Sequence, residues 1–129
     1  MLVIDASSLY EVLVGGARAA AVRARLEGDQ DHVAPHVIDA EVLGALRRDA
    51  LTGDVDQTAA RLAVLGLRRW HGRRFRHTPL LERAWELRAN VRTWDALYVA
   101  LAEALDVPLI TLDGRLARAT GVRCQIELV

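Results

Sequence analysis

The sequence contains no lysine, and all seventeen of its basic residues are arginines. A phosphate-binding loop that ends in Gly-Lys is therefore excluded, and so are mechanisms that use lysine as a Schiff-base or general-base group. Seventeen acidic residues balance the arginines, so the formal net charge is zero. Net charge thus provides no overall attraction to nucleic acid or to a membrane, and any such attraction has to come from local patches.

Cysteine and long apolar runs are also scarce. Cys124 is the only cysteine, which excludes an internal disulfide and a zinc site built from several thiolates. This is consistent with a reducing compartment, and we expect the protein to be cytoplasmic. Asp5 interrupts the N-terminal apolar run and no basic residue precedes it, so we expect no signal peptide. The apolar stretches are shorter than a membrane span, and no membrane association is expected.

What the chain does contain is enough apolar material for a core. Hydrophobic residues make up 52% of its 129 residues, which suits one domain around one core. There is no linker, repeat or low-complexity segment, so we treat residues 1–129 as a single domain.

Strand and helix patterns alternate along the chain. Apolar runs and turn residues predict strands at 1–7, 32–35, within 68–78, at 107–113 and at 124–129. Helical patterns occupy 9–14, 17–28, 37–53, 54–67, 79–90, 93–106 and 114–120, with Ser7 or Ser8 as the N-cap of the first. The clearest strands are continuous apolar runs. This indicates an α/β fold with a parallel sheet covered on both faces.

Four acidic residues occupy positions where burial is expected. Asp5 and Asp113 directly follow the two clearest strands, in "VIDAS" and "LITLD". Glu41 borders the apolar stripe of the helix at 37–53, and Asp95 lies in the first turn of a helix that is apolar on nearly every side. Ligands of parallel α/β sheets bind beyond the carboxyl ends of the strands. We therefore expect these acids to converge on one edge of the sheet.

Acids gathered in this way need a counter-charge. An acidic side chain is rarely buried unless it is paired with a charge or a metal, and each pair of carboxylates ~4 Å apart repels by roughly 4 kcal/mol at an effective dielectric constant of about 20. Oxygen ligands of this kind favour Mg²⁺ or Mn²⁺. Taken singly, each acid also has a structural interpretation, as a helix cap, a turn residue or a solvated side chain.

Four motifs carry a family resemblance: "VIDASSL", "DAEVLGAL", "TWDALYVALAE" and "LITLDGRLAR". In this order they resemble the acidic motifs of PIN-domain nucleases, and most closely those of VapC-type toxins from bacterial toxin–antitoxin pairs. The resemblance extends from Leu2 to Val129. It implies a metal-dependent ribonuclease on a three-layer α/β/α fold, with a central, mostly parallel sheet of four or five short strands.

Carried over by position, the resemblance implies an acidic cluster around one or two Mg²⁺ (or Mn²⁺) ions. Its members are Asp5, Glu41, Asp95 and Asp113. Ser7 and Thr111 are expected beside the cluster, in contact with its carboxylates or with metal-bound water. Some family members carry a further acid just after the fourth motif, but here Gly114 and Arg115 follow. Whether a second metal ion binds therefore stays open.

The expected mechanism is hydrolysis by a metal-activated water, which needs no side-chain nucleophile. The resemblance also implies an RNA substrate, a cognate antitoxin protein and a homodimer, and it implies no nucleotide cofactor. The RNA target and the identity of the antitoxin stay open.

The segment "RRWHGRRFRH" at 68–77 gathers five arginines around two aromatic residues. One interpretation is an RNA-binding patch, in which Arg73, Arg74 and Arg76 contact phosphates and an aromatic ring stacks on a base. The other is a solvated loop with its aromatic rings in the core. Arg92, just before the Asp95 helix, is a further candidate for phosphate contact.

Two other protein classes place acids at strand ends, but each needs a residue that this chain lacks. A response-regulator receiver needs a strand-end lysine, which is absent. A haloacid-dehalogenase-like phosphatase needs Asp-x-Asp after its first strand, where this chain has Ser7. A PIN nuclease in RNA processing or DNA-flap cleavage, or a non-catalytic binding module on the same fold, remains an alternative.

Overall fold

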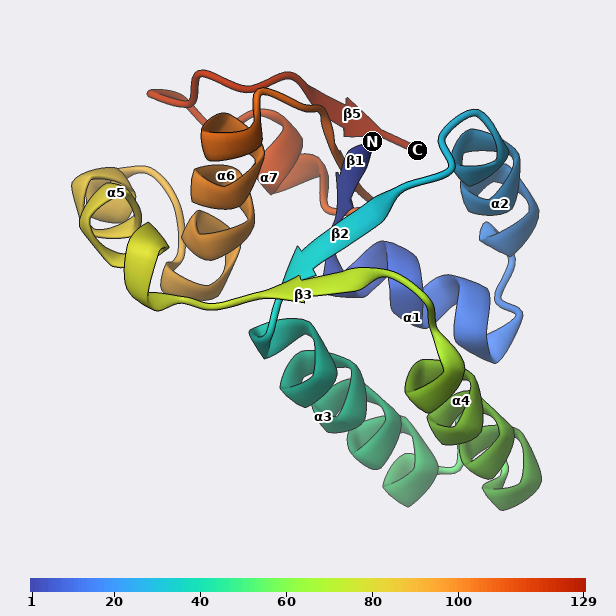
Figure 1. The fold of residues 1–129 in the computed structure, drawn as a ribbon. Helices are drawn as coiled ribbons and strands as arrows, with labels where there is room; N and C mark the ends of the chain where they lie inside the picture. The colour runs from blue at the N-terminus through green and yellow to red at the C-terminus, as the bar shows by residue number, and fades with distance from the viewer.

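The computed structural model describes all residues from 1 to 129 and contains a single five-stranded sheet (Figure 1). The strand order is β3-β2-β1-β4-β5, and every neighbouring pair is parallel. The strands are β1 (Leu2–Ile4), β2 (His32–Pro35), β3 (Arg73–Phe75), β4 (Leu109–Thr111) and β5 (Ile126–Leu128). The expected parallel sheet is therefore confirmed.

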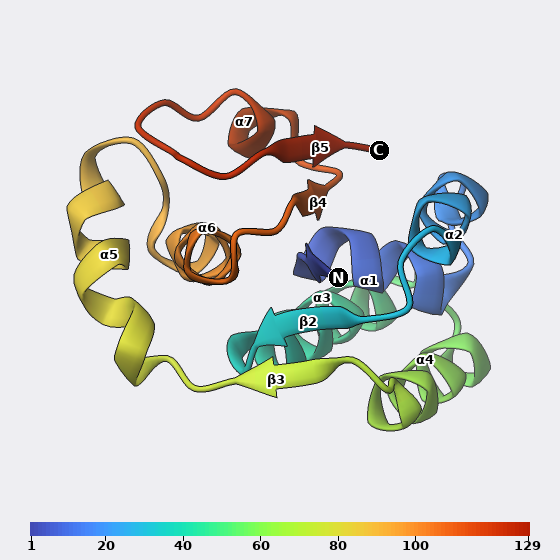
Figure 2. The same cartoon turned by 45° about the horizontal axis from the view of Figure 1, so that its top comes forward.

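Helices cover both faces of this sheet (Figures 1 and 2). One layer consists of α1 (Ala6–Val14), α2 (Ala19–Glu27), α3 (Val37–Thr52) and α4 (Gln57–Arg69), which pack against one another. The other contains α5 (Leu81–Glu86), α6 (Thr93–Leu105) and α7 (Gly114–Ala117), with the 3₁₀ turns η1 (Thr78–Leu80) and η2 (Leu87–Ala89) on either side of α5. This is the expected three-layer α/β/α fold. No helix combines the length and the apolar character needed to cross a membrane.

The core is centred on β1, β4 and α6. All residues of β1 and β4 are buried, and α6 is buried continuously from Ala96 to Ala102. A strand with helices on both faces has no solvated side, which explains why the two strands are continuous apolar runs. Each large aliphatic side chain buried in this way contributes about 1.5–3 kcal/mol to folding.

The strand order creates a crevice between β1 and β4. From β1 the chain moves outward to β2 and β3, and it then crosses to β4 on the other side of β1. The connections on the two sides of β1 therefore lie on opposite faces of the sheet, and ligands of α/β sheets bind where such connections diverge. Asp5 follows β1 and Asp113 lies two residues beyond β4, so both are at the carboxyl edge of this crevice.

Some local predictions differ from the structure. The expectation that Ser7 or Ser8 caps the first helix was wrong, because α1 begins at Ala6 and the Asp5 carboxylate accepts the Ser8 amide as its N-cap. Aspartate caps helices as well as serine does, and it already has extended backbone at the end of β1. The single helix expected at 79–90 is divided into η1, α5 and η2, since short helices often tighten into 3₁₀ turns at their ends.

Candidate active site

Asp5 is the most buried of the four acids, with 6% of its surface exposed. Its Oδ1 accepts the backbone N–H of Ser8 at 2.8 Å, and the Ser7 hydroxyl donates to both carboxylate oxygens at 2.9 and 2.8 Å. The Thr111 hydroxyl donates to Oδ2 at 2.6 Å. The carboxylate is thus held by hydrogen bonds from its own helix and from β4, and by no positive charge.

The same hydroxyls tie the ends of β1 and β4 together. Ser7 Oγ accepts the Leu112 backbone N–H at 3.1 Å, and Thr111 Oγ1 accepts that of Asp113 at 2.9 Å. Burial raises the pKa of Asp5, and the hydrogen bonds from Thr111, Ser8 and Ser7 offset this only in part. Ser7 and Thr111 therefore both donate hydrogen bonds to Asp5.

Glu41 reaches the site from α3 and contacts α6. Tyr98 Oη donates to its Oε2 at 2.6 Å. Burial raises the pKa of Glu41, the charges of Asp95 and Asp5 raise it further, and the Tyr98 hydrogen bond opposes both. The pKa of the buried Tyr98 phenol is raised far above its ordinary value, so it stays a hydrogen-bond donor.

Asp95 lies in the first turn of α6 and has no hydrogen bond to its carboxylate. Burial raises its pKa, and so do the negative charges of Asp113 and Asp5, whereas Arg92 and Arg115 lower it. Of the four acids, it is the one whose carboxylate accepts no hydrogen bond from the protein.

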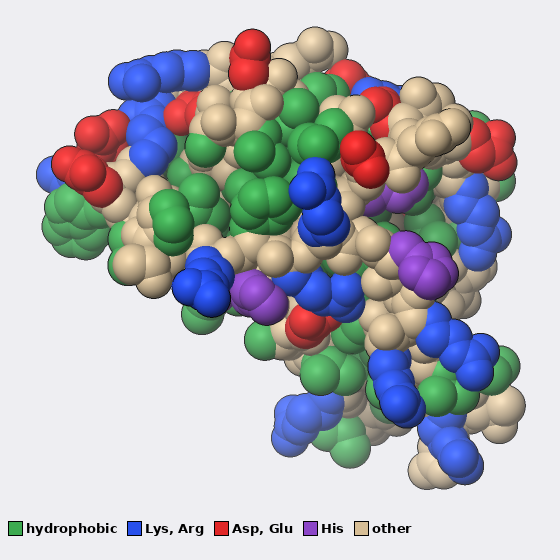
Figure 3. Space-filling view, in the orientation of Figure 1, with side chains coloured by type: hydrophobic (Ala, Val, Ile, Leu, Met, Phe, Trp, Pro, Cys, Tyr) green, Lys and Arg blue, Asp and Glu red, His purple; other side chains and the backbone are tan.

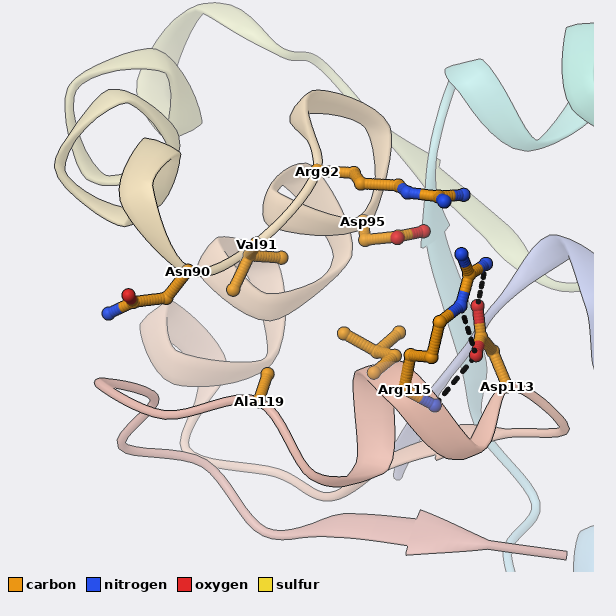
Figure 4. Close-up of a pocket in the computed structure, with 8 residues that line it drawn as sticks. Asn90, Val91, Arg92, Asp95, Asp113, Arg115 and Ala119 are labelled. Atoms are coloured by element: carbon orange, nitrogen blue, oxygen red, sulfur yellow. Dashed lines mark hydrogen bonds and ion pairs between the residues drawn. The ribbon is translucent and has the colours of Figure 1, made fainter.

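A pocket of about 260 Å³ opens between the start of α6 and α7 (Figure 4). Its lining residues are Asn90, Val91, Arg92, Asp95, Asp113, Arg115, Leu116 and Ala119. Asp113 caps α7 by accepting the Arg115 backbone N–H at 2.8 Å, and its carboxylate also pairs with the Arg115 guanidinium at 3.0 Å. This ion pair is the main reason that the pKa of Asp113 is lowered. Asp5 and Glu41 do not line the pocket itself.

The four acids are electrostatic neighbours, but they do not surround a single point. Asp5 acts on the pKa of both Glu41 and Asp95, and Asp113 acts on that of Asp95. Even so, no three carboxylate, imidazole or thiol side chains are arranged to hold one metal ion. The donor chemistry, which is oxygen only, suits Mg²⁺ or Mn²⁺. Binding such an ion requires side-chain rotations that bring the carboxylates together.

Two of the arginines proposed for RNA contact are engaged elsewhere. Arg74 pairs with Asp39 at 2.8 Å and lies over the Trp70 ring, 4.8 Å from its centroid. Arg73 starts β3, so it lies at the opposite edge of the sheet from the acids, and its guanidinium is 3.9 Å from Met1 Sδ. The two aromatic residues of this segment pack against the core, as the second interpretation expected.

The other two basic candidates are closer to the acids. Arg92 is exposed and lines the pocket beside Asp95 (Figure 4). Arg76 is exposed and follows the carboxyl end of β3, at the acidic edge of the sheet.

Sequence reasoning missed two partners within the site. The hydrogen bond between Tyr98 and Glu41 joins residues on different helices. The one signal in the sequence is that Tyr98 follows Asp95 by three residues, which places both on the same face of α6. Arg115 was noted only where a further acid was absent. It lies two residues after the aspartate that caps α7, a spacing that permits the ion pair but does not specify it.

Comparisons with a family model, with related sequences and with solved structures all give the same family. The family model described as PIN domain matches residues 2–122. Ribonuclease VapC1 of Mycobacterium tuberculosis is 46% identical over 128 residues, covering 98% of this chain and 96% of the relative.

Among solved structures, Mycobacterium tuberculosis VapC20, a sarcin-ricin loop cleaving toxin, aligns with a TM-score of 0.70 at 19% identity and covers 95% of this chain and 97% of that one. VapBC2 of Rickettsia felis aligns with a TM-score of 0.67 at 11% identity, covering 99% of this chain and 98% of that one. The resemblance inferred from the four motifs is confirmed, and the chain belongs to the PIN-domain family, within its VapC ribonucleases.

Proposed function

We propose that the protein is a Mg²⁺-dependent endoribonuclease, the toxin of a toxin–antitoxin pair, with residues 1–129 forming a single PIN domain. The observation that carries the proposal is the crowding of four carboxylates at the carboxyl edge of β1 and β4. Burial raises the pKa values of Asp5, Glu41 and Asp95, and neighbouring negative charges raise those of Glu41 and Asp95 further. None of these three forms an ion pair. A divalent cation would relieve this repulsion.

In this proposal Asp5, Glu41, Asp95 and Asp113 hold one or two Mg²⁺ (or Mn²⁺) ions. Once bound, Mg²⁺ polarises a phosphate and lowers the pKa of a water molecule. The protein's own contribution is orientation. Ser7 and Thr111 fix the Asp5 carboxylate, and Tyr98 fixes that of Glu41.

The substrate contacts are proposed from charge and position. Arg92, and at longer range Arg76, would bind phosphates of a single RNA strand that passes the pocket mouth. Arg73 and Arg74 are weaker candidates, because one lies at the far edge of the sheet and the other is paired with Asp39.

The surface of α3 and α4 supports a protein partner. A groove of about 430 Å³ between these helices is lined mainly by apolar side chains, including Leu43, Val64 and Leu65, which are 42–45% exposed. Figure 3 shows green apolar and blue basic side chains over this part of the molecule. Exposed apolar surface of this kind marks interaction sites.

The relatives favour an antitoxin as that partner. The Rickettsia felis structure is of VapBC2 bound to a DNA fragment from their promoter. We propose that this chain likewise has a cognate antitoxin, that it forms a homodimer, and that it acts in the cytoplasm.

The test is cleavage of a labelled RNA transcript with Mg²⁺ and with a chelator. Wild type should cut only with the metal, and Asp5→Asn and Glu41→Gln should lose activity by about 10²-fold or more. The matched control is Asp31→Asn, which changes an exposed aspartate whose carboxylate has no partner, at the opposite edge of the sheet. If Asp5→Asn cuts RNA as fast as wild type, the proposed metal site is wrong.

A cellular test separates a toxin from the alternatives. Inducing the gene should stop growth, and inducing the Asp95→Ala form should not. Equal growth with both would favour a nuclease for RNA processing or DNA-flap cleavage. A protein that binds an antitoxin but cuts no nucleic acid would be a binding module.

A further inference from the structure

Asp113 differs from the other three acids in having a positive partner. Arg115 Nη2 lies 3.0 Å from its Oδ2, and Arg115 Nε lies 3.4 Å from its Oδ1 (Figure 4). Both groups line the same pocket as Asp95. One of the proposed metal ligands is therefore already occupied by a cation that belongs to the protein.

The two oxygens of Asp113 differ in their shortest hydrogen bonds. Oδ1 accepts the Arg115 backbone N–H at 2.8 Å, and this hydrogen bond caps α7. Oδ2 accepts a hydrogen bond from the Arg115 guanidinium at 3.0 Å. The guanidinium has no other partner, and the Arg115 side chain is 61% exposed. Because the cap depends on the backbone N–H, the guanidinium can leave without unfolding the helix.

We propose that Arg115 is a resident counter-ion of Asp113, which a divalent metal displaces and which then binds the phosphate of the incoming RNA. This inference rests on the proposed function, because it assumes a metal at the acidic edge. A metal ion and a guanidinium at one carboxylate repel each other. The displaced side chain stays tethered at the mouth of the pocket.

The pocket geometry favours the phosphate as its new partner. Figure 4 shows Arg92 entering from the start of α6 and Arg115 from α7, with the Asp95 carboxylate beside Arg92 and the Asp113 carboxylate paired with Arg115. Two guanidinium groups that line one opening suit a phosphodiester, since each can donate two parallel hydrogen bonds to it. In this view Arg115 makes the acidic pocket less repulsive before the metal arrives, and it contributes to substrate binding afterwards.

A plain surface ion pair would behave differently. Exposed pairs contribute little to stability, and removing one would leave both metal affinity and cleavage nearly unchanged. Our proposal instead requires changes of opposite sign when Arg115→Ala is made. The affinity for metal rises because a competitor is lost, and the efficiency of RNA cleavage falls because a phosphate contact is lost.

The first experiment is calorimetric titration of the purified full chain with Mn²⁺. We expect Arg115→Ala to bind Mn²⁺ roughly three- to tenfold more tightly than wild type. Arg61→Ala is the matched control, because it removes the same charge from an exposed side chain of α4, which is not in contact with α7. Equal affinities for wild type and Arg115→Ala would overturn the counter-ion role alone. Failure of wild type to bind Mn²⁺ would overturn the metal site itself, and with it the proposed function.

The second experiment measures cleavage of a long, mixed-sequence RNA transcript at saturating Mg²⁺. We expect kcat/KM to fall roughly tenfold in Arg115→Ala, mainly through a higher KM, as for loss of a charge-assisted hydrogen bond. Arg115→Lys keeps the charge but not the bidentate geometry, so its metal affinity should stay near that of wild type while its KM rises. Cleavage by Arg115→Ala that equals or exceeds wild type would overturn the phosphate role.

Discussion

Replacing Asp95 by asparagine removes a charge from the acidic edge without removing a hydrogen bond. The Asp95 carboxylate has no hydrogen-bond partner, and Asp113 and Asp5 both act on it as neighbouring negative charges. Asparagine has nearly the same shape and remains neutral. We therefore expect Asp95→Asn to make the metal-free protein more stable, although it removes a proposed metal ligand.

The magnitude follows from Coulomb's law and from burial. Two like charges roughly 8 Å apart repel by about 2 kcal/mol at an effective dielectric constant of about 20. Salt screens part of this repulsion for a half-buried group, and Arg92 and Arg115 offset another part. We expect a net gain of about 1 kcal/mol in the free energy of unfolding. For a chain of this size this raises Tm by roughly 3–5 °C.

The gain should depend on pH in a defined direction. The pKa of Asp95 is raised above its ordinary value of 3.8 in the folded state, so the folded protein binds this proton more tightly than the unfolded chain does. Wild type therefore loses stability as pH rises from the unfolded pKa through the folded one. The advantage of Asp95→Asn should be absent near pH 3 and complete near pH 8.

The assay is urea unfolding of wild type and Asp95→Asn from pH 3 to pH 8 in the presence of a chelator. Adding Mg²⁺ at pH 8 should then stabilise wild type more than the variant, because ligand binding to the folded state shifts the unfolding equilibrium. A variant that is less stable than wild type at pH 8, or equally stabilised by Mg²⁺, would refute the reasoning.

Two further substitutions probe the contacts around the site. Tyr98→Phe removes the hydrogen bond to Glu41 and should cost about 1–2 kcal/mol in urea unfolding, with a further rise in the pKa of Glu41 in NMR titration. A Glu41 pKa that is unchanged would count against this bond. Thr111→Val leaves the Asp113 N–H without its acceptor and removes one of the donors to Asp5, so it should cost about 2 kcal/mol. No loss of stability would mean that water replaces the hydroxyl.

Glu103→Gln weakens contacts of a mostly buried carboxylate with Arg83 at 2.6 Å and with the Arg123 N–H at 2.7 Å, at a cost of about 2 kcal/mol. Burial opposes ionisation of Glu103, but these partners lower its pKa overall. The difference in the free energy of unfolding between Glu103→Gln and wild type should therefore be present above about pH 4.5. It should disappear as the pH falls through the pKa of Glu103 in the folded state. A difference that persists in acid would contradict this account.

Local features of the fold were readable from the sequence. The apolar runs that became β1 and β4 and the nearly all-apolar helix α6 stood out because a central position leaves them no solvated face. Helix ends were less certain, since Asp5 and Ser7 both suit an N-cap and only the strand before them decides between the two. The divided helix after Pro79 carried no distinguishing signal.

The contacts between segments that are distant in the sequence could not be predicted from it. The sequence predicted acids at strand ends, but it did not predict that β1 and β4 are neighbours, which is what brings Thr111 to Asp5. The ion pair of Asp113 with Arg115 and the engagement of Arg74 by Asp39 depend on side-chain geometry that no spacing specifies. For the same reason, the absence of three acids around a common point could not be foreseen.

The central claim is that the acids at the carboxyl edge of β1 and β4 bind a divalent metal. The most direct test is a crystal of the wild-type protein soaked with Mn²⁺ and measured for anomalous scattering. Our account predicts a peak coordinated by carboxylate oxygens of Asp5 and Asp95, which is lost in Asp5→Asn crystals. A peak only at other surface carboxylates, or an unchanged peak in Asp5→Asn, would contradict it.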